Sequence, residues 1–384
     1  MTPRRTTVSW NGANARRMAR QGLTDPLTAG PDGIVAVMPA AQAQILSAAE
    51  LSVGLRGRGL TRAGVRAALW TDRTLVKTFG PRGTVHLVAA ADLPMWTGAL
   101  SALPAGLGGQ PEGVRMSPRE TETVLAAIGD ALTGAELTVD ELTDAVVERA
   151  GAWAGEEVMP AFGTMWPRWR QVTHLASHRG LLCFGPDRGR KVTYTRPDVT
   201  PLDGPAGVAA LVRRYLYAYG PAAPQDFARW LAAPNRWAAE VFDRAAAAGE
   251  AEEVVHEDGT AAWVVAGDTA FPEEPVRGVR LLPYFDAFVI ASQPRARLYP
   301  GAAYERALAG GQAGNFPVLL VDGVVAGVWH QRRSGRRLAV TVEPLSPLTG
   351  GRLRELDEQV ARVGEVGEAR PELTLGAVTV GPHA

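Results

Sequence analysis

Two glutamines separated by one small residue, Gln42 and Gln44, have the type and spacing for a reaction that uses water. A carboxamide can accept a hydrogen bond from a water molecule and donate one to it, although it cannot act as an acid. Side chains at positions i and i+2 point the same way in an extended segment but lie about 200° apart on a helix. We therefore expect the pair on an extended turn entering a helix, with Pro39 helping to set the turn. A solvated polar edge is the alternative interpretation.

Other reactive side chains form weaker patterns. His174 and His178 have the i, i+4 spacing of a zinc site, but no third ligand follows at a suitable distance, so we expect no metal. Cys183 lies in an apolar run and is expected in the core. Asp286 lies among phenylalanines and needs a partner, which favours a structural hydrogen-bonding role over a catalytic one. Adjacent glutamate pairs diverge, and the sequence has no phosphate-loop, dinucleotide-binding or serine-nucleophile motif.

Composition indicates a globular protein without an internal disulfide framework. The chain has 384 residues, 46% of them hydrophobic, and a single cysteine, which predicts two or three domains. No apolar run of about 18 residues and no signal sequence occur, so we expect a soluble, cytoplasmic protein. The net charge is zero, yet all basic residues except Lys77 and Lys191 are arginines. Guanidinium groups match phosphate oxygens, although a GC-rich coding bias explains the enrichment equally well.

The first hundred residues predict helices followed by a two-stranded hairpin. A helix within 6–23 carries Arg16, Arg17 and Arg20 on a basic face, which is either solvated or in contact with DNA. The segments that follow are, in order, an apolar run at 34–38, a helix ending near 57–59, a helix at 60–70, and strands at 75–79 and 84–88 around a turn at 80–83. Helices followed by such a hairpin indicate a winged helix.

The same order recurs twice. After a linker at 106–113, the second copy has helices at 118–132, 138–150 and 166–178 and strands at 180–184 and 191–195 around a turn at 185–189. The third has helices at 208–219, 221–230 and 236–248 and strands at 253–256 and 261–265. Three copies predict three tandem winged helices.

The last hundred residues predict a strand meander, with segments at 280–288, 315–321, 324–330 and 338–342. Its second connection, 331–337, carries Arg332, Arg333, Arg336 and Arg337 around a Ser-Gly turn. Such a tip repels itself unless anions are near. A hairpin that enters a DNA groove or clamps the backbone is favoured over a solvated loop.

Several motifs in this order make the chain similar to one known family. They are Gln42-Ala43-Gln44, Arg82-Gly83-Thr84-Val85-His86-Leu87-Val88, Gly180-Leu181-Leu182-Cys183-Phe184-Gly185-Pro186, Leu282-Pro283-Tyr284-Phe285-Asp286 and Gly314-Asn315-Phe316-Pro317. Together they resemble the AlkZ-type winged-helix DNA glycosylases. The resemblance implies an α+β fold with three tandem winged helices in a C-shape around DNA and a C-terminal β-rich meander. The expected segments are 1–105, 106–200, 201–270 and 271–384.

The resemblance also implies removal of N7-alkylated guanine, and in some members the unhooking of interstrand cross-links made by bacterial genotoxins. Family members with two glutamines are often associated with resistance to one natural product, whereas a Gln-x-Asp branch is broader. The residue type agrees, because an N7-alkylguanine is already charged and leaves without an acid. The expected activity is therefore a monofunctional hydrolase of N-glycosyl bonds, with water held by Gln42 and Gln44. An open cleft suits a tethered base better than a flipping pocket.

The expected partner is double-stranded DNA carrying alkylated guanine, bound by a monomer without membrane, cofactor or metal. Candidate DNA contacts are the four hairpin arginines together with Arg82, His86, Arg188, Arg190 and Lys191 in the wings of the first two copies. Two alternatives remain open. One is a winged-helix transcriptional regulator without catalysis, and the other is a protein that sequesters a DNA-reactive toxin.

Overall fold

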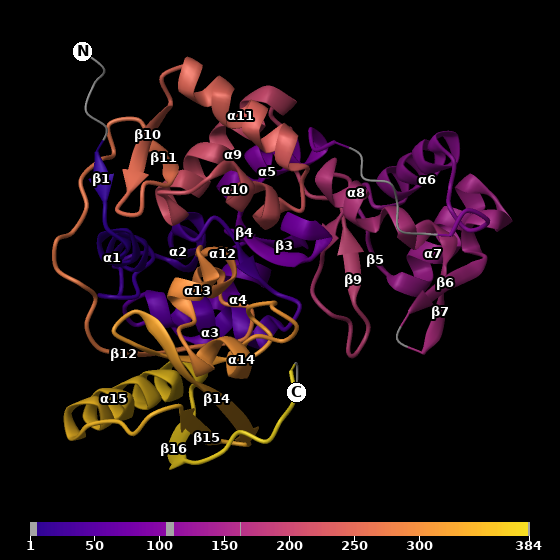
Figure 1. Ribbon diagram of the computed structural model, residues 1–384. Coiled ribbons are helices and arrows are strands. Elements are labelled where there is room, and N and C mark those ends of the chain that lie inside the picture. The colour runs from indigo at the N-terminus through magenta and orange to yellow at the C-terminus, as the bar shows by residue number, and fades with distance from the viewer. Residues whose placement is uncertain (1–5, 105–110, 162, 383–384) are drawn as a thin grey trace. The chain divides into compact units, whose positions relative to one another are not determined.

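The computed structural model describes residues 6–104, 111–161 and 163–382 and is a mixed α+β protein (Figure 1). Its chain divides into two compact units. The first comprises Met1–Leu75, Leu87–Ala89 and Val212–Ala384, and the second comprises Val76–His86 and Ala90–Leu211. Residues 106–110 of the predicted linker lie outside the described residues. Within the described ranges, no helix has the length and apolar character to cross a lipid bilayer.

The N-terminal elements follow the predicted order, with one short strand added before the first helix. They are β1 (Thr7–Val8), α1 (Trp10–Arg20), α2 (Pro31–Val37), β2 (Ala41–Gln42), α3 (Leu46–Arg56), α4 (Arg62–Trp70), β3 (Leu75–Phe79), the 3-10 turn η1 (Pro81–Gly83) and β4 (Val85–Ala89). The predicted hairpin is therefore confirmed, and β2, β4 and β3 form one sheet in that order. The helix expected within 6–23 begins only at Trp10, because Ser9 caps it by accepting from Gly12 N at 3.0 Å.

The second unit contains one hairpin that the sequence did not predict. Its elements are η2 (Ala90–Asp92), α5 (Leu93–Ser101), α6 (Pro118–Ala131), β5 (Glu136–Thr138), α7 (Val139–Ala150), η3 (Ala152–Gly155), β6 (Glu157–Ala161), β7 (Thr164–Pro167), η4 (Arg168–Val172), α8 (Thr173–His178), β8 (Cys183–Phe184) and β9 (Thr193–Thr195). The helix expected at 166–178 was wrong in its first half, because Trp166 pairs with Met159 in the β6/β7 hairpin. Its neighbour Pro167 disfavours helical backbone at that position. The capping box at Thr138 and Glu141 is confirmed.

The third predicted group of helices is confirmed and belongs mostly to the first unit. It comprises α9 (Gly204–Tyr219), α10 (Pro224–Leu231), α11 (Asn235–Ala247), β10 (Ala251–His256) and β11 (Ala261–Val265). The hairpin of β10 and β11 takes β1 as a third, parallel strand, with Val8 opposite His256. This pairing explains why residues 7–8 are extended rather than helical. Val8 packs there with Val254 and Val264 in a small core.

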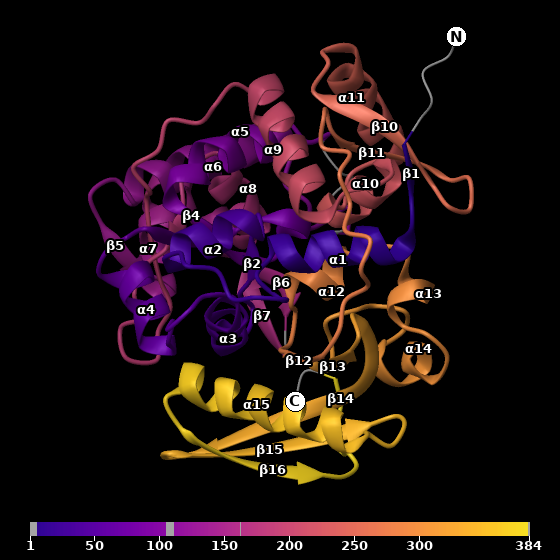
Figure 2. The ribbon, with the colours of Figure 1, turned by 90° about the vertical axis from the view of Figure 1, so that its left-hand side faces the viewer.

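The C-terminal part is a five-stranded sheet that extends the predicted meander. Its elements are β12 (Val279–Leu282), α12 (Ala287–Ala291), α13 (Arg295–Leu298), α14 (Ala302–Ala307), β13 (Val318–Val321), β14 (Val324–Ser334), β15 (Arg337–Pro344), α15 (Gly350–Gly367) and β16 (Arg370–Leu375). The strand order follows the chain, and the last pair, β15 and β16, is parallel. Helix α15 is the crossover that a parallel pair requires. Figures 1 and 2 show it along one face of the sheet, where Val340, Leu356 and Val363 share a core.

Helix α3 packs closely against α15. A Cβ on Gly54 would lie 2.3 Å from Val366 Cγ1, so glycine is needed at this contact. Arg362 on α15 donates to the carbonyl oxygens of Gly54 at 2.7 Å and Gly57 at 2.6 Å. The assignment of the three helical groups to winged helices, and the four predicted segments, stay predictions.

Candidate active site

Gln42 and Gln44 meet side by side at the entrance to α3. Gln42 ends the short strand β2, and Gln44 lies in the bend before the helix, as the extended spacing predicted. Gln42 Nε2 donates a hydrogen bond of 2.5 Å to Gln44 Oε1. The two differ in exposure, because Gln42 is 7% exposed whereas Gln44 faces solvent. Gln42 therefore holds the amide oxygen of Gln44, and Gln44 is accessible to water.

Contacts from other elements hold the turn that precedes the glutamines. Pro39 has a φ of 34°, a strained value for this residue, so neighbouring contacts must maintain it. One such contact comes from Tyr219 at the end of α9. Its buried hydroxyl donates to the carbonyl oxygen of Met38 at 2.7 Å.

A buried ion pair fixes the other end of α3. Arg56 and Asp286 are both fully buried and form two parallel hydrogen bonds, from Nη2 to Oδ1 at 2.7 Å and from Nη1 to Oδ2 at 2.8 Å. Ser52 donates to Asp286 Oδ2 at 2.7 Å. Asp286 Oδ1 also accepts from the backbone of Phe288, the first turn of α12, at 3.0 Å. These hydrogen bonds agree with the structural role that the sequence favoured for Asp286 over a catalytic one.

A second acidic residue on α3 is also buried. Glu50 is 1% exposed and accepts from Arg62 Nε at 2.7 Å and from Arg66 Nε at 2.6 Å, which joins α3 to α4. The sequence did not single out Glu50, Ser52 or Arg56. Charged residues in a helix usually form a solvated face, and their partners lie too far along the chain to be inferred from spacing.

The basic hairpin is present, and its four arginines differ in the contacts that they make. Gly335 and Arg336 form a two-residue turn between the paired residues Ser334 and Arg337. Arg332, Arg336 and Arg337 are exposed and have no ion pair within the described part of the chain. Arg333 instead donates from Nη1 to the carbonyl oxygen of Gly367 at 2.5 Å and from Nε to that of Gly335 at 3.1 Å. Arg333 therefore caps the C-terminus of α15.

Two of the basic residues predicted to contact DNA in the second unit form ion pairs with acidic side chains. Arg188 forms an ion pair of 2.8 Å with Glu141, and Lys191 forms one of 2.7 Å with Asp140. These pairs are solvent-exposed, so they contribute little and are readily exchanged for other anions. Arg190 is exposed next to them.

His86, predicted to contact DNA, is buried. The ring is 3% exposed, and its Nδ1 is 2.8 Å from the carbonyl oxygen of Thr84. Burial, and next the charge of Arg82, lower the pKa of His86 to about 3, so the ring is neutral near pH 7. A contact with DNA would require this strand to rearrange. Arg82 itself is half-buried, with a φ of 61°.

The solvated basic face expected on α1 is wrong, because Arg16 and Arg17 are buried. The alternative, a contact of these arginines with DNA, stays a prediction. Arg16 donates to the carbonyl oxygen of Asp268 at 2.7 Å, and Arg17 donates to that of Gln293 at 2.8 Å. Arg20 forms a bidentate pair with Asp268. Burial lowers the pKa of Arg16 to about 9 and that of Arg17 to about 10. These guanidinium groups hold loops together, which helical periodicity alone does not reveal.

His174 and His178 pack edge to face, with ring centroids 5.6 Å apart. Burial and the neighbouring His174 lower the pKa of His178 to about 4. Among the described residues, no group of three or more His, Cys, Asp or Glu side chains is placed to hold a metal ion. Cys183 is buried, as expected.

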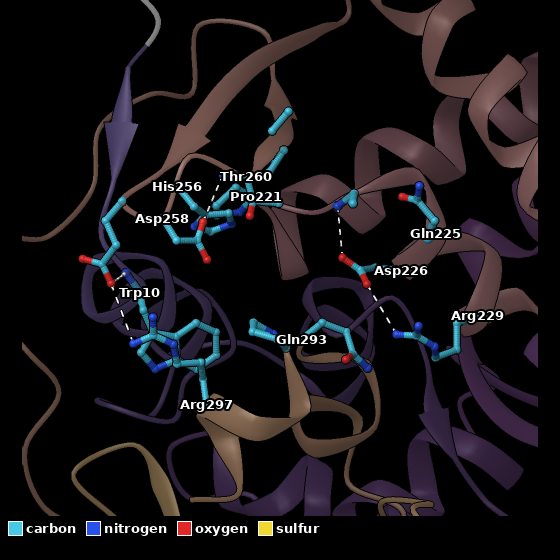
Figure 3. Close-up of a pocket in the computed structure, with 15 residues that line it drawn as sticks. Trp10, Pro221, Gln225, Asp226, Arg229, His256, Asp258, Thr260, Gln293 and Arg297 are labelled. Carbon is cyan, nitrogen blue, oxygen red and sulfur yellow. Dashed lines mark hydrogen bonds and ion pairs between the residues drawn. The ribbon is translucent and has the colours of Figure 1, made fainter.

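A separate pocket of about 400 Å³ lies in the first unit (Figure 3). Trp10, the start of α10 and the turn between β10 and β11 enclose it, together with the loop between α12 and α13. Asp226 and Arg229 pair across one wall at 3.5 Å. The predicted site residues do not line this pocket, so it is separate from the site predicted at the glutamines.

Comparisons with known proteins agree on one family. The family described as DNA glycosylase AlkZ-like matches residues 35–366. A curated relative from Streptomyces sahachiroi, named interstrand DNA cross-link repair glycosylase, is 30% identical over 340 residues, which cover 84% of this chain and 88% of the relative. A solved structure, the Streptomyces sahachiroi DNA glycosylase AlkZ, has a TM-score of 0.82 and 27% identity and covers 96% of this chain and 100% of its own.

Proposed function

The chain belongs to the AlkZ-like DNA glycosylase family, and we propose that it hydrolyses the N-glycosidic bond of cationic N7-alkylated guanine in double-stranded DNA. Gln42 and Gln44 position the attacking water. The observation that carries this proposal is the amide pair itself, held by a 2.5 Å hydrogen bond with Gln44 facing solvent. Two amides can orient a water molecule but cannot protonate a leaving group.

This limitation selects the substrate. The oxygen of the positioned water forms a bond to the sugar C1′, and the bond from C1′ to N9 breaks. Its electron pair neutralises the charged guanine ring, which leaves as free N7-alkylguanine. The proton from the water passes to solvent, and an abasic site remains. A normal base would need the acid that carboxylates supply in glycosidases.

The name of the Streptomyces sahachiroi relative favours interstrand cross-links over small adducts as the natural lesions. We extend the proposal accordingly to DNA repair and self-resistance to a DNA-alkylating natural product. The protein acts as a cytoplasmic monomer, and its three helical groups are winged helices arranged around DNA. An open site would admit a base still tied to the opposite strand.

Three duplexes test the proposal, carrying an N7-methylguanine, a bulky N7 adduct and an interstrand cross-link. After incubation with the purified protein, alkali cleaves abasic sites, and the released base is identified by mass spectrometry. We expect strand cleavage at the modified guanine and none in unmodified duplex. A protein that binds all three duplexes and releases no base is a binding protein, and the proposal is then wrong.

The hairpin tip should contribute to DNA affinity by neutralising phosphates. Replacing Arg332, Arg336 and Arg337 with alanine is expected to weaken binding and to make its salt dependence shallower, by about 0.9 in log–log slope for each phosphate that is no longer neutralised. Fluorescence anisotropy at several salt concentrations measures both quantities.

A matched control for charge is the triple alanine variant of the exposed Arg236, Arg244 and Arg354. It removes the same net charge from helices α11 and α15 and should keep the slope of the wild type. Equal slopes for the hairpin variant and the wild type would show that the tip does not touch phosphate.

A further inference from the structure

A pocket of about 290 Å³ lies beside α3, within the first unit. Helix α3 forms one wall, and the start of α4 forms the next. The β14/β15 hairpin next to its turn and the C-terminal turns of α15 complete it. The pocket is thus bordered both by the helix that follows the glutamines and by the basic hairpin.

The pocket begins close to Gln44. Ser47 lines it and is exposed, three residues after Gln44, and Glu50 and Leu51 continue the same wall. Residues three and four apart are neighbours on one face of a helix, so Ser47, Glu50 and Leu51 share one face of α3, which begins at Leu46. The pocket therefore starts at the end of α3 that follows Gln44 in the chain.

Its lining is apolar at the base and polar at the rim. Leu51, Leu338 and Val363 belong to the core between the sheet and α15. Arg62 and Arg333 contribute guanidinium groups at the rim. The charge of Glu50 is already balanced by Arg62 and Arg66, so Glu50 does not make the pocket acidic. Ligand pockets typically combine an apolar interior with a few polar groups in this way.

We propose that this pocket receives the substituent carried on N7 of the damaged guanine, a planar aromatic or largely apolar group with polar edges. The proposal rests on the function proposed above. N7 is separated from the N9 of the scissile bond by a single ring atom, so a group on N7 begins beside the reacting carbon. Guanidinium planes stack on aromatic rings, which gives Arg62 and Arg333 a role at the rim. A methyl group is too small to reach the pocket.

A backbone phosphate is the competing occupant, and the lining disfavours it. Phosphate recognition requires cationic and hydrogen-bonding groups at a surface. A phosphate gains nothing from contact with the apolar side chains of Leu51, Leu338 and Val363 at the base of the pocket. One rim cation, Arg62, is also engaged by Glu50 at 2.7 Å, and Arg333 is engaged by Gly367.

Filling the pocket tests the proposal. Ser47→Trp places an indole at its mouth, and Gln331→Trp fills it from the opposite wall, on β14. Each variant is compared with the wild type on N7 adducts of increasing size, placed in one sequence context. We expect the loss in kcat/KM to grow with the substituent and to be at least about tenfold larger for a fused aromatic adduct than for a methyl adduct.

A control accompanies the series. Ala361→Trp adds an indole to an exposed position of α15 that does not line the pocket. It should follow the wild type across the series, and thermal unfolding verifies that every variant is folded.

The outcomes separate the two proposals. A wild-type protein that releases no N7-alkylguanine overturns the proposed function. Release by the wild type, with an equal loss for every substituent in both filling variants, overturns the pocket proposal alone. If the equal loss is accompanied by a shallower salt dependence of DNA binding, the pocket proposal is also overturned, and the pocket is identified as a phosphate site.

Discussion

Replacing Gln42 and Gln44 together with alanine is expected to lower the single-turnover rate of N7-alkylguanine release by at least about 10²-fold, because the attacking water loses the groups that orient it. The affinity for adduct-containing DNA should change little, since neither amide carries the charge that binds phosphate. Rapid-quench measurement of abasic sites and fluorescence anisotropy report the two quantities separately.

The single variants should be unequal. Gln44→Ala removes the solvent-facing amide, whereas Gln42→Ala removes the group that orients it, so we expect the larger loss for Gln44→Ala. Gln225→Ala, at an exposed position of α10, is the matched control and should retain full activity. Undiminished base release by the double variant would falsify the assignment of the water to this pair.

Asp286→Ala should lower the free energy of unfolding by about 3–5 kcal/mol, because it leaves the buried guanidinium of Arg56 without its carboxylate partner. Urea denaturation followed by circular dichroism measures this change. Because Arg56 lies on α3, a loss of order in that helix should also reduce base release in the fraction that remains folded.

Two further variants distinguish a charge effect from simple loss of packing. Asp286→Asn keeps acceptors for Phe288 and Arg56 and should be destabilised less than Asp286→Ala. The double variant Arg56→Met with Asp286→Leu removes both charges and should be more stable than Asp286→Ala. If the double variant is the least stable of the three, the buried charge is not what makes Asp286→Ala costly.

The sequence predicted those features that depend on neighbouring residues. The hairpins of β3 with β4 and of β10 with β11 follow from short strand patterns around turn residues. The extended setting of Gln42 and Gln44 follows from a two-residue spacing. In each case the information lies within about ten residues of the feature.

Features that depend on distant contacts were not predictable in this way. Arg56 and Asp286 are separated by 230 positions, and Arg17 reaches the carbonyl of Gln293 over 276 positions. Both arginines have the helical setting that usually indicates a surface residue, and only the tertiary fold shows that they are buried. The strand β16 was not predicted for a related reason, since a parallel partner needs the whole of α15 to reach it.

The attachment of α15 has a consequence for how a lesion would be found. Near its C-terminal end, this helix is joined to the basic hairpin through Arg333 and to α3 through Arg362. The basic hairpin and the helix that follows the glutamines are thus both attached to α15. If the tip bound the phosphates of a DNA strand, the nucleotide at the glutamines would always lie the same number of nucleotides along that strand from the bound phosphates. Since phosphate contacts carry no sequence information, such a spacing would let the enzyme survey every guanine alike and leave the choice to the charge of the base.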